Sequence, residues 1–297
     1  MLEAVVNVSE GRRADVLDGL RRACGPALLD VHTDADHDRS VFTLVGATPA
    51  ETELAVRRLA DAVAAAPFDG TASDGVHPKL GVLDVVPFVA VGGDSTLAVD
   101  AARAFGAWLA SEHAVPVFFY DGADPGARSL PDVRRDAFTA RPPDVGPPRP
   151  HPHLGATAVG ARPPMIAVNC ELDTDDLDLA RDIARRVRAR DGGLAGVRAL
   201  GFPLATRGRV QVSMNLVDLE ATGLEAACIR VRDLAASTGR AVIRVEIVGL
   251  VPASELAETS AGFSAWSGVT AERTIEAAMA RVAAGGDGPG SGGPAGR

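Results

Sequence analysis

The chain has 297 residues, with 30 basic and 39 acidic side chains and a formal net charge of −9. This length suggests one large domain or two smaller ones, and it is enough to bury a large core without disulfides. The acidic balance argues against a protein that binds duplex nucleic acid, because such a protein needs a basic face. It leaves open a small anionic ligand held by a local arginine cluster.

The cysteines and the apolar pattern indicate a protein of the reducing cytoplasm. Three cysteines lie far apart with no CxxC spacing, which argues against a cysteine-based zinc site. Residues 1–7 lack the basic start and the long apolar core of a signal peptide. No apolar run approaches the ~20 residues of a membrane span. We therefore expect a cytoplasmic protein that does not cross a membrane.

Hydrophobic periodicity predicts an alternation of strands and helices in the first 120 residues. Thr48 is placed as an N-cap before Pro49, with Glu51 three residues later in the position of a capping box. The expected strands cover 3–8, 27–32, 39–46, 82–91 and 115–120, and the expected helices cover 12–24, 49–66 and 95–113.

The composition changes after the last of these strands. Eight of the 20 prolines lie between residues 124 and 153. This stretch is too long for an ordinary connector, so we interpret it as a functional loop or a linker.

The second half of the chain repeats the earlier order of elements. Thr174 with Leu177 is expected to cap the first helix of this half. The expected strands cover 164–171, 197–203, 209–217 and 241–249, the expected helices cover 174–189 and 222–237, and a short helix follows Pro252. The last 13 residues hold seven glycines and two prolines, a composition typical of disorder.

Each half therefore follows the order βαββαβ, the ferredoxin-like pattern. This predicts an α+β fold with two such subdomains, mainly antiparallel sheets and a cleft or tunnel between them. We place the N-terminal subdomain at 1–173, the C-terminal subdomain at 174–284 and a disordered tail at 285–297.

All six histidines lie in the first 153 residues, which places acid–base chemistry in that half. His77 lies in a loop rich in glycine and proline just before a strand, where a histidine can face a cleft or simply be solvated. His32 and His37, with three aspartates between 32 and 38, could meet a metal ion, but aspartate and histidine also favour a turn between paired strands. We favour the turn and expect no metal.

Arginines and a neutral polar row are the remaining candidates for ligand binding. Arg39 and Arg162 each lie beside a predicted strand, where a guanidinium can hold a carboxylate with two hydrogen bonds. The alternative for each residue is an ordinary surface arginine without a ligand. Gln211, Ser213 and Asn215 alternate with apolar residues and would share one face of a strand, lining a cleft or facing solvent.

Five blocks, in this order along residues 3–260, resemble one family. They are Asn7–Arg12 with Leu28–Val31 and Asp38–Thr43, then His77–Phe88, then Gly155–Arg162 with Ile166–Asn169, then Gln211–Leu216, and finally Val248–Pro252. The family is glutamate formiminotransferase, the transferase part of the bifunctional formiminotransferase-cyclodeaminase.

The resemblance implies transfer of a formimino group from N-formimino-L-glutamate to N5 of tetrahydrofolate, in histidine degradation, by a homodimer with two α/β subdomains. It places the catalytic general acid/base on His77. The donor would be bound by Arg39 and by His32, which stands where the bifunctional proteins carry an active-site aspartate. The folate-binding residues implied are Arg162, Ile166, Asn169, Gln211, Ser213 and Asn215.

The residues fit this chemistry without a metal, because a protonated amidine is already electrophilic and a histidine can pass a proton to the leaving amine. Two alternatives stay open on the same scaffold. One is a related folate enzyme that uses formylglutamate or has cyclo-ligase-like activity on 5-formyltetrahydrofolate. The other is a folate-binding protein without turnover. A metal hydrolase built on His32 and His37 is a third hypothesis.

Overall fold

The computed structural model describes residues 1–68 and 79–284 and divides them into two compact units. Unit 1 comprises the described residues of Met1–Pro163, and unit 2 comprises Pro164–Ala284. Each unit has its own sheet and its own hydrophobic core.

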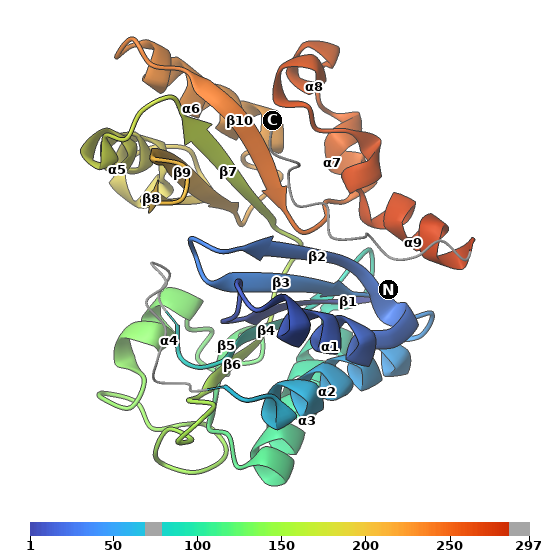
Figure 1. Cartoon of the computed structure of the whole chain (residues 1–297). Helices are drawn as coiled ribbons and strands as arrows, with labels where there is room; N and C mark the ends of the chain where they lie inside the picture. Colours follow the sequence, from blue (N-terminus) through green and yellow to red (C-terminus); the bar gives the residue numbers. More distant parts are fainter. Residues whose placement is uncertain (69–78, 285–297) are drawn as a thin grey trace. The chain divides into compact units, whose positions relative to one another are not determined.

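The sheet of unit 1 has six strands in the order β2-β3-β1-β4-β6-β5 (Figure 1). The pairs β2–β3, β3–β1 and β1–β4 are antiparallel, whereas β6 runs parallel to both β4 and β5, so the sheet is mixed. The strands are β1 (Leu2–Val8), β2 (Leu28–Asp34), β3 (Arg39–Leu44), β4 (Leu83–Ala90), β5 (Val117–Asp121) and β6 (Thr157–Ala161).

Helices α1 (Ala14–Cys24), α2 (Pro49–Ala65) and α3 (Ser95–His113) cover one face of this sheet (Figure 1). Their apolar side chains form one core with alternate residues of the strands, among them Val6 and Phe88. The short helix α4 (Leu130–Asp136) belongs to a second cluster, in which Val133 packs on Val85 and Phe118. Polar residues on this second face of the sheet are therefore separated from the main core.

The order β1-α1-β2-β3-α2-β4 confirms the first predicted βαββαβ unit. Thr48 is the N-cap of α2, and its side chain accepts a hydrogen bond from the Glu51 amide at 3.3 Å. The Glu51 carboxylate itself accepts from the Ala47 amide. Strand β6 was not predicted, because its residues are mostly small and have little strand propensity. It forms because all five are buried between two parallel neighbours.

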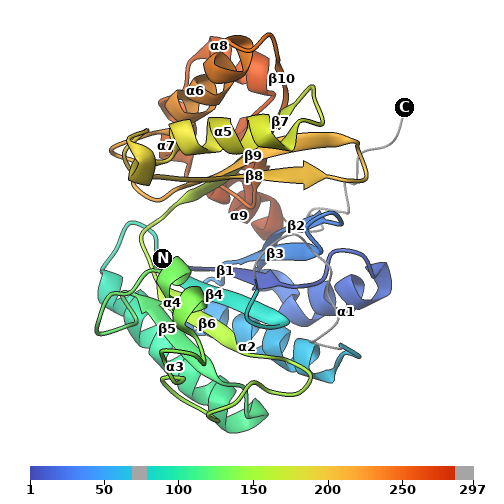
Figure 2. The same ribbon diagram turned by 90° about the vertical axis from the view of Figure 1, so that its left-hand side faces the viewer.

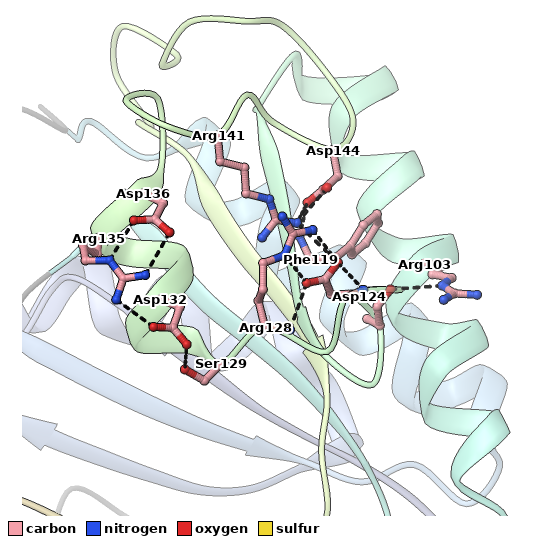
Figure 3. A network of polar contacts seen from close by, with 12 residues as sticks. Arg103, Phe119, Asp124, Arg128, Ser129, Asp132, Arg135, Asp136, Arg141 and Asp144 are labelled. Atoms are coloured by element: carbon pink, nitrogen blue, oxygen red, sulfur yellow. Dashed lines mark hydrogen bonds and ion pairs between the residues drawn. The ribbon is translucent and has the colours of Figure 1, made fainter. Parts of the chain in front are cut away.

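The proline-rich stretch 124–153 is part of unit 1 and is no free linker. Val145 pairs with Val117 of β5, and the 151–155 turn joins the stretch to Gly81. Asp124 accepts hydrogen bonds from Arg128 at 2.6 and 2.7 Å, and Asp144 accepts from Arg141 (Figure 3). Ion pairs inside the stretch thus hold it in one conformation without long regular elements.

Unit 2 contains an antiparallel sheet of four strands in the order β10-β7-β9-β8. Helices α5 (Leu177–Val187) and α6 (Leu224–Ala236) lie on one face of it and bury a single core (Figure 2). The order β7-α5-β8-β9-α6-β10 confirms the second βαββαβ unit. The strands are β7 (Ile166–Leu172), β8 (Val197–Leu204), β9 (Arg209–Leu216) and β10 (Val242–Val248).

Two details of unit 2 differ from expectation. Strand β7 lies inside unit 2 because it pairs with β9 and β10, whereas the expected boundary after residue 173 assigns it to the first subdomain. The N-cap of α5 is Asp176, which accepts from the Leu179 amide, whereas Thr174, two residues earlier, accepts from the Asp176 amide.

Short helices follow the last strand of unit 2. They are α7 (Ala253–Ala257), α8 (Ala261–Ser267) and α9 (Ile275–Ala283). The predicted tail at 285–297 lies outside the described residues. Across 1–68 and 79–284, no helix is long and apolar enough to cross a membrane.

Candidate functional site

The face of the unit 1 sheet opposite α1–α3 carries a row of polar side chains from three strands. In β1, alternate residues such as Val6 point into the core, so Asn7 points to the opposite face. Arg39 of β3 donates from Nε to Asn7 Oδ1 at 3.0 Å and from Nη1 to Asp84 Oδ2 at 2.8 Å. A side chain of each strand, β1, β3 and β4, is thereby fixed against the next.

Asp84 is placed by an irregularity in the sheet. Asn7 pairs with Val85 and Val8 pairs with Leu83, so Asp84 is the extra residue of a bulge. Such bulges re-aim a side chain and are frequent beside active sites. The Asp84 carboxylate is 0% exposed and also accepts from the Leu80 amide at 2.7 Å.

A second arginine reaches the same carboxylate from α4. Arg134 donates from Nη2 to Asp84 Oδ2 at 2.5 Å, so one oxygen serves two guanidinium groups. Burial opposes ionisation of Asp84, but the charges of Arg39 and Arg134 and the Leu80 amide hold its pKa below the usual value. Asp84 is therefore an ionised, fully buried group at neutral pH.

Tyr120 lies on the same face of the sheet, in the cluster that contains Val85 and Val133, with Arg162 beside it. A Cβ on Gly160 would lie 2.4 Å from the Tyr120 ring, so only glycine lets the ring lie against β6. Burial raises the pKa of Tyr120, although the neighbouring Arg162 favours the phenolate. Arg162 follows β6 directly, and its Nη1 donates to the Pro163 carbonyl at 3.0 Å.

His77 lies outside the described residues. The residues that flank 69–78 are fixed by hydrogen bonds to the segment after β1. After the gap, Ser9 Oγ donates to the Gly81 carbonyl at 2.9 Å, and the Ser9 amide donates to the Val82 carbonyl at 2.8 Å. Before the gap, Arg13 donates to the Pro67 carbonyl and is oriented by Glu10 at 2.6 Å. Ser9 and Arg13, which follow β1, thus bind the residues on both sides of 69–78.

Residues 32–38 form the end of β2 and a turn into β3. His32 pairs with Val41, and Asp34 pairs with Arg39. The carboxylate of Asp34 accepts from the His37 amide at 2.8 Å, and that of Asp38 accepts from the Gly11 amide at 3.0 Å. Asp34 thus stabilises the predicted turn, whereas Asp38 connects the turn to the segment after β1. In the described part of the chain, no group of three or more such side chains could hold a metal ion.

The sheet face of unit 2 opposite α5 and α6 carries a row of polar side chains, with the exposed Leu200 beside it. Gln211, Ser213 and Asn215 alternate with core residues of β9 and share this face, as predicted. Ser213 lies opposite Asn169 of β7, so Asn169 joins the same row. Ile166 instead is 0% exposed within the core, so its side chain packs under α5 and α6 and lies away from the row.

Comparison with known proteins identifies the group to which this fold belongs. Residues 1–162 match the formiminotransferase domain, N-terminal subdomain, and residues 167–282 match the formiminotransferase domain. The chain belongs to the formiminotransferase family. The two matches meet between residues 162 and 167, where the structure separates unit 1 from unit 2.

Members of the formiminotransferase family from distant organisms align with almost the whole chain. A glutamate formimidoyltransferase of Streptococcus pyogenes serotype M1 is 36% identical over 276 residues, covering 88% of this chain and 92% of that protein. One from Thermoplasma acidophilum is 33% identical over 302 residues, covering 95% and 98%. The formimidoyltransferase-cyclodeaminase of Sus scrofa is 35% identical over 286 residues, covering 88% of this chain and 52% of that protein.

The structure brings together residues that the sequence analysis did not combine. Of the candidates in unit 1, Arg39 lies in the network of Asp84, and Arg162 lies beside Tyr120. Asp84, Arg134 and Tyr120 were not among the predicted site residues. Asp84 stands inside a block of family resemblance and so could have been found, but nothing in the local sequence points to Arg134.

Proposed function

We propose that the protein is a glutamate formimidoyltransferase. It transfers the formimino group of N-formimino-L-glutamate to N5 of tetrahydrofolate, giving 5-formiminotetrahydrofolate and glutamate in histidine degradation. The observation that carries this proposal is the similarity, over 92% and 98% of their lengths, to two proteins that bear this activity in their names. Both halves of the chain also match formiminotransferase domains.

The chemistry requires little beyond proton transfer and binding of carboxylates. N5 of the folate attacks the amidine carbon and forms a C–N bond and a tetrahedral intermediate. The bond between that carbon and the glutamate nitrogen then breaks, and the leaving amine takes up a proton. We assign this general acid/base role to His77, because a histidine is half-protonated near neutral pH. We expect no metal, since the protonated amidine is already activated.

The binding roles are assigned from the family resemblance, and the polar rows of the two units support them. Arg162 and the row of Asn169, Gln211, Ser213 and Asn215 are proposed to bind the folate. Arg39 and His32 are proposed to serve the donor, with Arg39 held in orientation by Asn7 and Asp84. The proposal includes a homodimer in the cytoplasm.

A transfer assay tests the function. Purified protein is incubated with tetrahydrofolate and, in parallel, with N-formimino-L-glutamate, N-formyl-L-glutamate or N-formimino-L-aspartate. Turnover is expected with the first donor. Because His32 stands where the bifunctional relatives carry aspartate, preference for the formyl donor would instead support the related folate enzyme. Folate binding without any turnover would support a binding protein.

The role of His77 is tested by His77→Ala in the same assay. Loss of general acid–base catalysis is expected to lower kcat about 10²- to 10⁴-fold. The dissociation constant for tetrahydrofolate, measured by calorimetry, should stay nearly unchanged. His113→Ala is the control, because His113 pairs with Asp61 on the helical face of unit 1. Near-normal turnover of His77→Ala would refute the role.

A further inference from the structure

Arg134 is largely buried, and among the described residues few of its N–H donors make hydrogen bonds. Within residues 1–68 and 79–284, its hydrogen bonding is limited to the contact of Nη2 with Asp84 Oδ2 at 2.5 Å. Its Nε is buried and has no hydrogen-bond partner in the described part of the chain. The side chain is 17% exposed, so part of it can still be reached from outside. A guanidinium has five N–H donors, and most of those of Arg134 are unused.

The charge of Arg134 is also incompletely balanced. The oxygen that it contacts is the one that accepts from Arg39 Nη1 at 2.8 Å. Burial lowers the pKa of Arg39, and the charge of Arg134 lowers it further while Asp84 opposes both. Arg134 also favours the phenolate of Tyr120, as does Arg162. Three arginines, Arg39, Arg134 and Arg162, therefore act along this side of the sheet.

The acidic residues nearest in sequence do not neutralise Arg134. Asp132 and Asp136 of the same helix both pair with Arg135, at 2.8 Å each (Figure 3). Asp121, at the end of β5, acts on Tyr120 with the opposite sign. Asp84 is the one carboxylate in contact with Arg134 among the described residues.

We propose that Arg134 binds a carboxylate of a substrate, and that Asp84 is the positioning residue that holds it for this purpose. The proposal rests on the proposed function, since both substrates carry such groups. The carboxylate belongs either to the amino-acid donor or to the glutamate tail of the folate. A bidentate carboxylate would satisfy unused donors of Arg134, whose contact with Asp84 uses Nη2 alone.

The experiment compares Arg134→Gln with Arg128→Gln, which likewise removes one of two arginines beside a buried carboxylate, Asp124. The KM for each substrate is measured with the other saturating. Arg134→Gln is expected to raise one KM about 10- to 100-fold, the usual worth of a hydrogen bond to a charged group, with kcat changed only a few-fold. Arg128→Gln should change neither KM. Arg134→Lys, which keeps the charge, should recover part of the loss.

Two arms distinguish the source of the carboxylate. A higher KM for the donor alone assigns Arg134 to the amino acid. Weaker binding of tetrahydrofolate, with unchanged binding of a tetrahydropterin that lacks the glutamate tail, assigns it to the folate. Unchanged KM values for both substrates in folded Arg134→Gln would overturn the inference.

The role of Arg134 can be tested even if the proposed function is wrong. If the wild-type chain transfers no group, calorimetry with tetrahydrofolate and with glutamate still tests carboxylate binding. Equal affinities of wild type and Arg134→Gln for both ligands would then refute a role of Arg134 in carboxylate binding. If Arg134→Gln does not fold, as judged by thermal melting, Arg134→Lys takes its place, and wild-type KM values in that variant count against the proposal.

Discussion

Two carboxylates in unit 1, Asp84 and Asp124, are both fully buried, and each lies beside two arginines. They differ in how their partners are distributed along the chain. Arg128 and Arg141 lie within 17 residues of Asp124, in the same proline-rich stretch (Figure 3). Arg39 and Arg134 lie 45 and 50 residues from Asp84. The first network orders one loop, and the second joins β3, β4 and α4.

The charge balance differs as well. Arg141 is shared by Asp124 and Asp144, so two arginines face two carboxylates there. Arg141 also leaves Nη1 without a hydrogen bond, so an unused donor alone does not distinguish the two networks. Among the residues that the structure describes, one carboxylate oxygen of Asp84 is bound by both Arg39 and Arg134. We infer that the Asp124 network holds the fold of one loop, whereas Arg134, which shares the single oxygen of Asp84 with Arg39, is suited to an anionic ligand.

The largest effect is expected from Asp84→Asn, which removes the buried carboxylate that Arg39 and Arg134 share. Removing one partner of a buried ion pair typically costs about 3–5 kcal/mol of unfolding free energy. Urea denaturation measures this loss. Kinetics should show in addition a raised KM for the substrate that Arg134 binds.

Asp124→Asn provides the contrast. Hydrogen bonds from Arg128 hold the pKa of Asp124 well below its usual value, so this variant should also lose stability. Its KM values, measured on protein shown to be folded, should match those of the wild type. If Asp124→Asn raises KM as much as Asp84→Asn does, the division into a structural and a ligand-binding network is wrong.

A smaller effect is expected from adding one methyl group near each network. In Gly160→Ala the new Cβ would lie 2.4 Å from the buried Tyr120 ring, and relieving such overpacking typically costs about 1–3 kcal/mol. In Gly126→Ala, beside Asp124, the nearest atom is Arg128 Nε at 3.4 Å, an ordinary contact. Thermal melting should therefore separate the two variants. Equal melting temperatures would show that Tyr120 can move freely.

The sequence predicted most of the fold because its elements follow local rules. Thr48 and Pro49 mark the start of α2, and α3 has the predicted limits of 95 and 113. Strand β6 was not predicted, because its small residues form a strand only where neighbouring strands bury them. The strand at 164–171 was counted in the second βαββαβ repeat, and its pairing with β9 and β10 moves the boundary from residue 173 to before β7.

The candidate site was predicted less completely, for a similar reason. The alternation of β9 was enough to place Gln211, Ser213 and Asn215 on one face. The same alternation in β7 separates Asn169 from Ile166, which is a core residue. Arg134 reaches Asp84 only through the fold of a stretch without regular periodicity. Its neighbour Arg135 has the same residue type and pairs with local aspartates instead, so composition cannot distinguish them.

The smallest predicted effect concerns the turn that connects the two networks. His151 Nδ1 accepts from the amides of His153 and Leu154, at 3.2 and 3.0 Å. The Leu154 carbonyl in turn accepts from the Val82 amide, close to Asp84. Protonation of Nδ1 would remove both of these hydrogen bonds, so the turn requires the neutral imidazole.

Burial, with a smaller contribution from His153, lowers the pKa of His151 from its ordinary value of 6.5. The unfolded chain therefore binds this proton more readily, and its uptake destabilises the fold. The contribution of His151 is complete above about pH 6.5 and is lost as the pH falls toward its folded pKa. Asp84 and Asp124 stay ionised in this range, because both pKa values are lowered. His151→Asn keeps an acceptor but does not titrate, so its melting temperature should fall less than that of the wild type between pH 7 and 5. His153→Asn is the control, and a wild-type slope for His151→Asn would contradict the assignment.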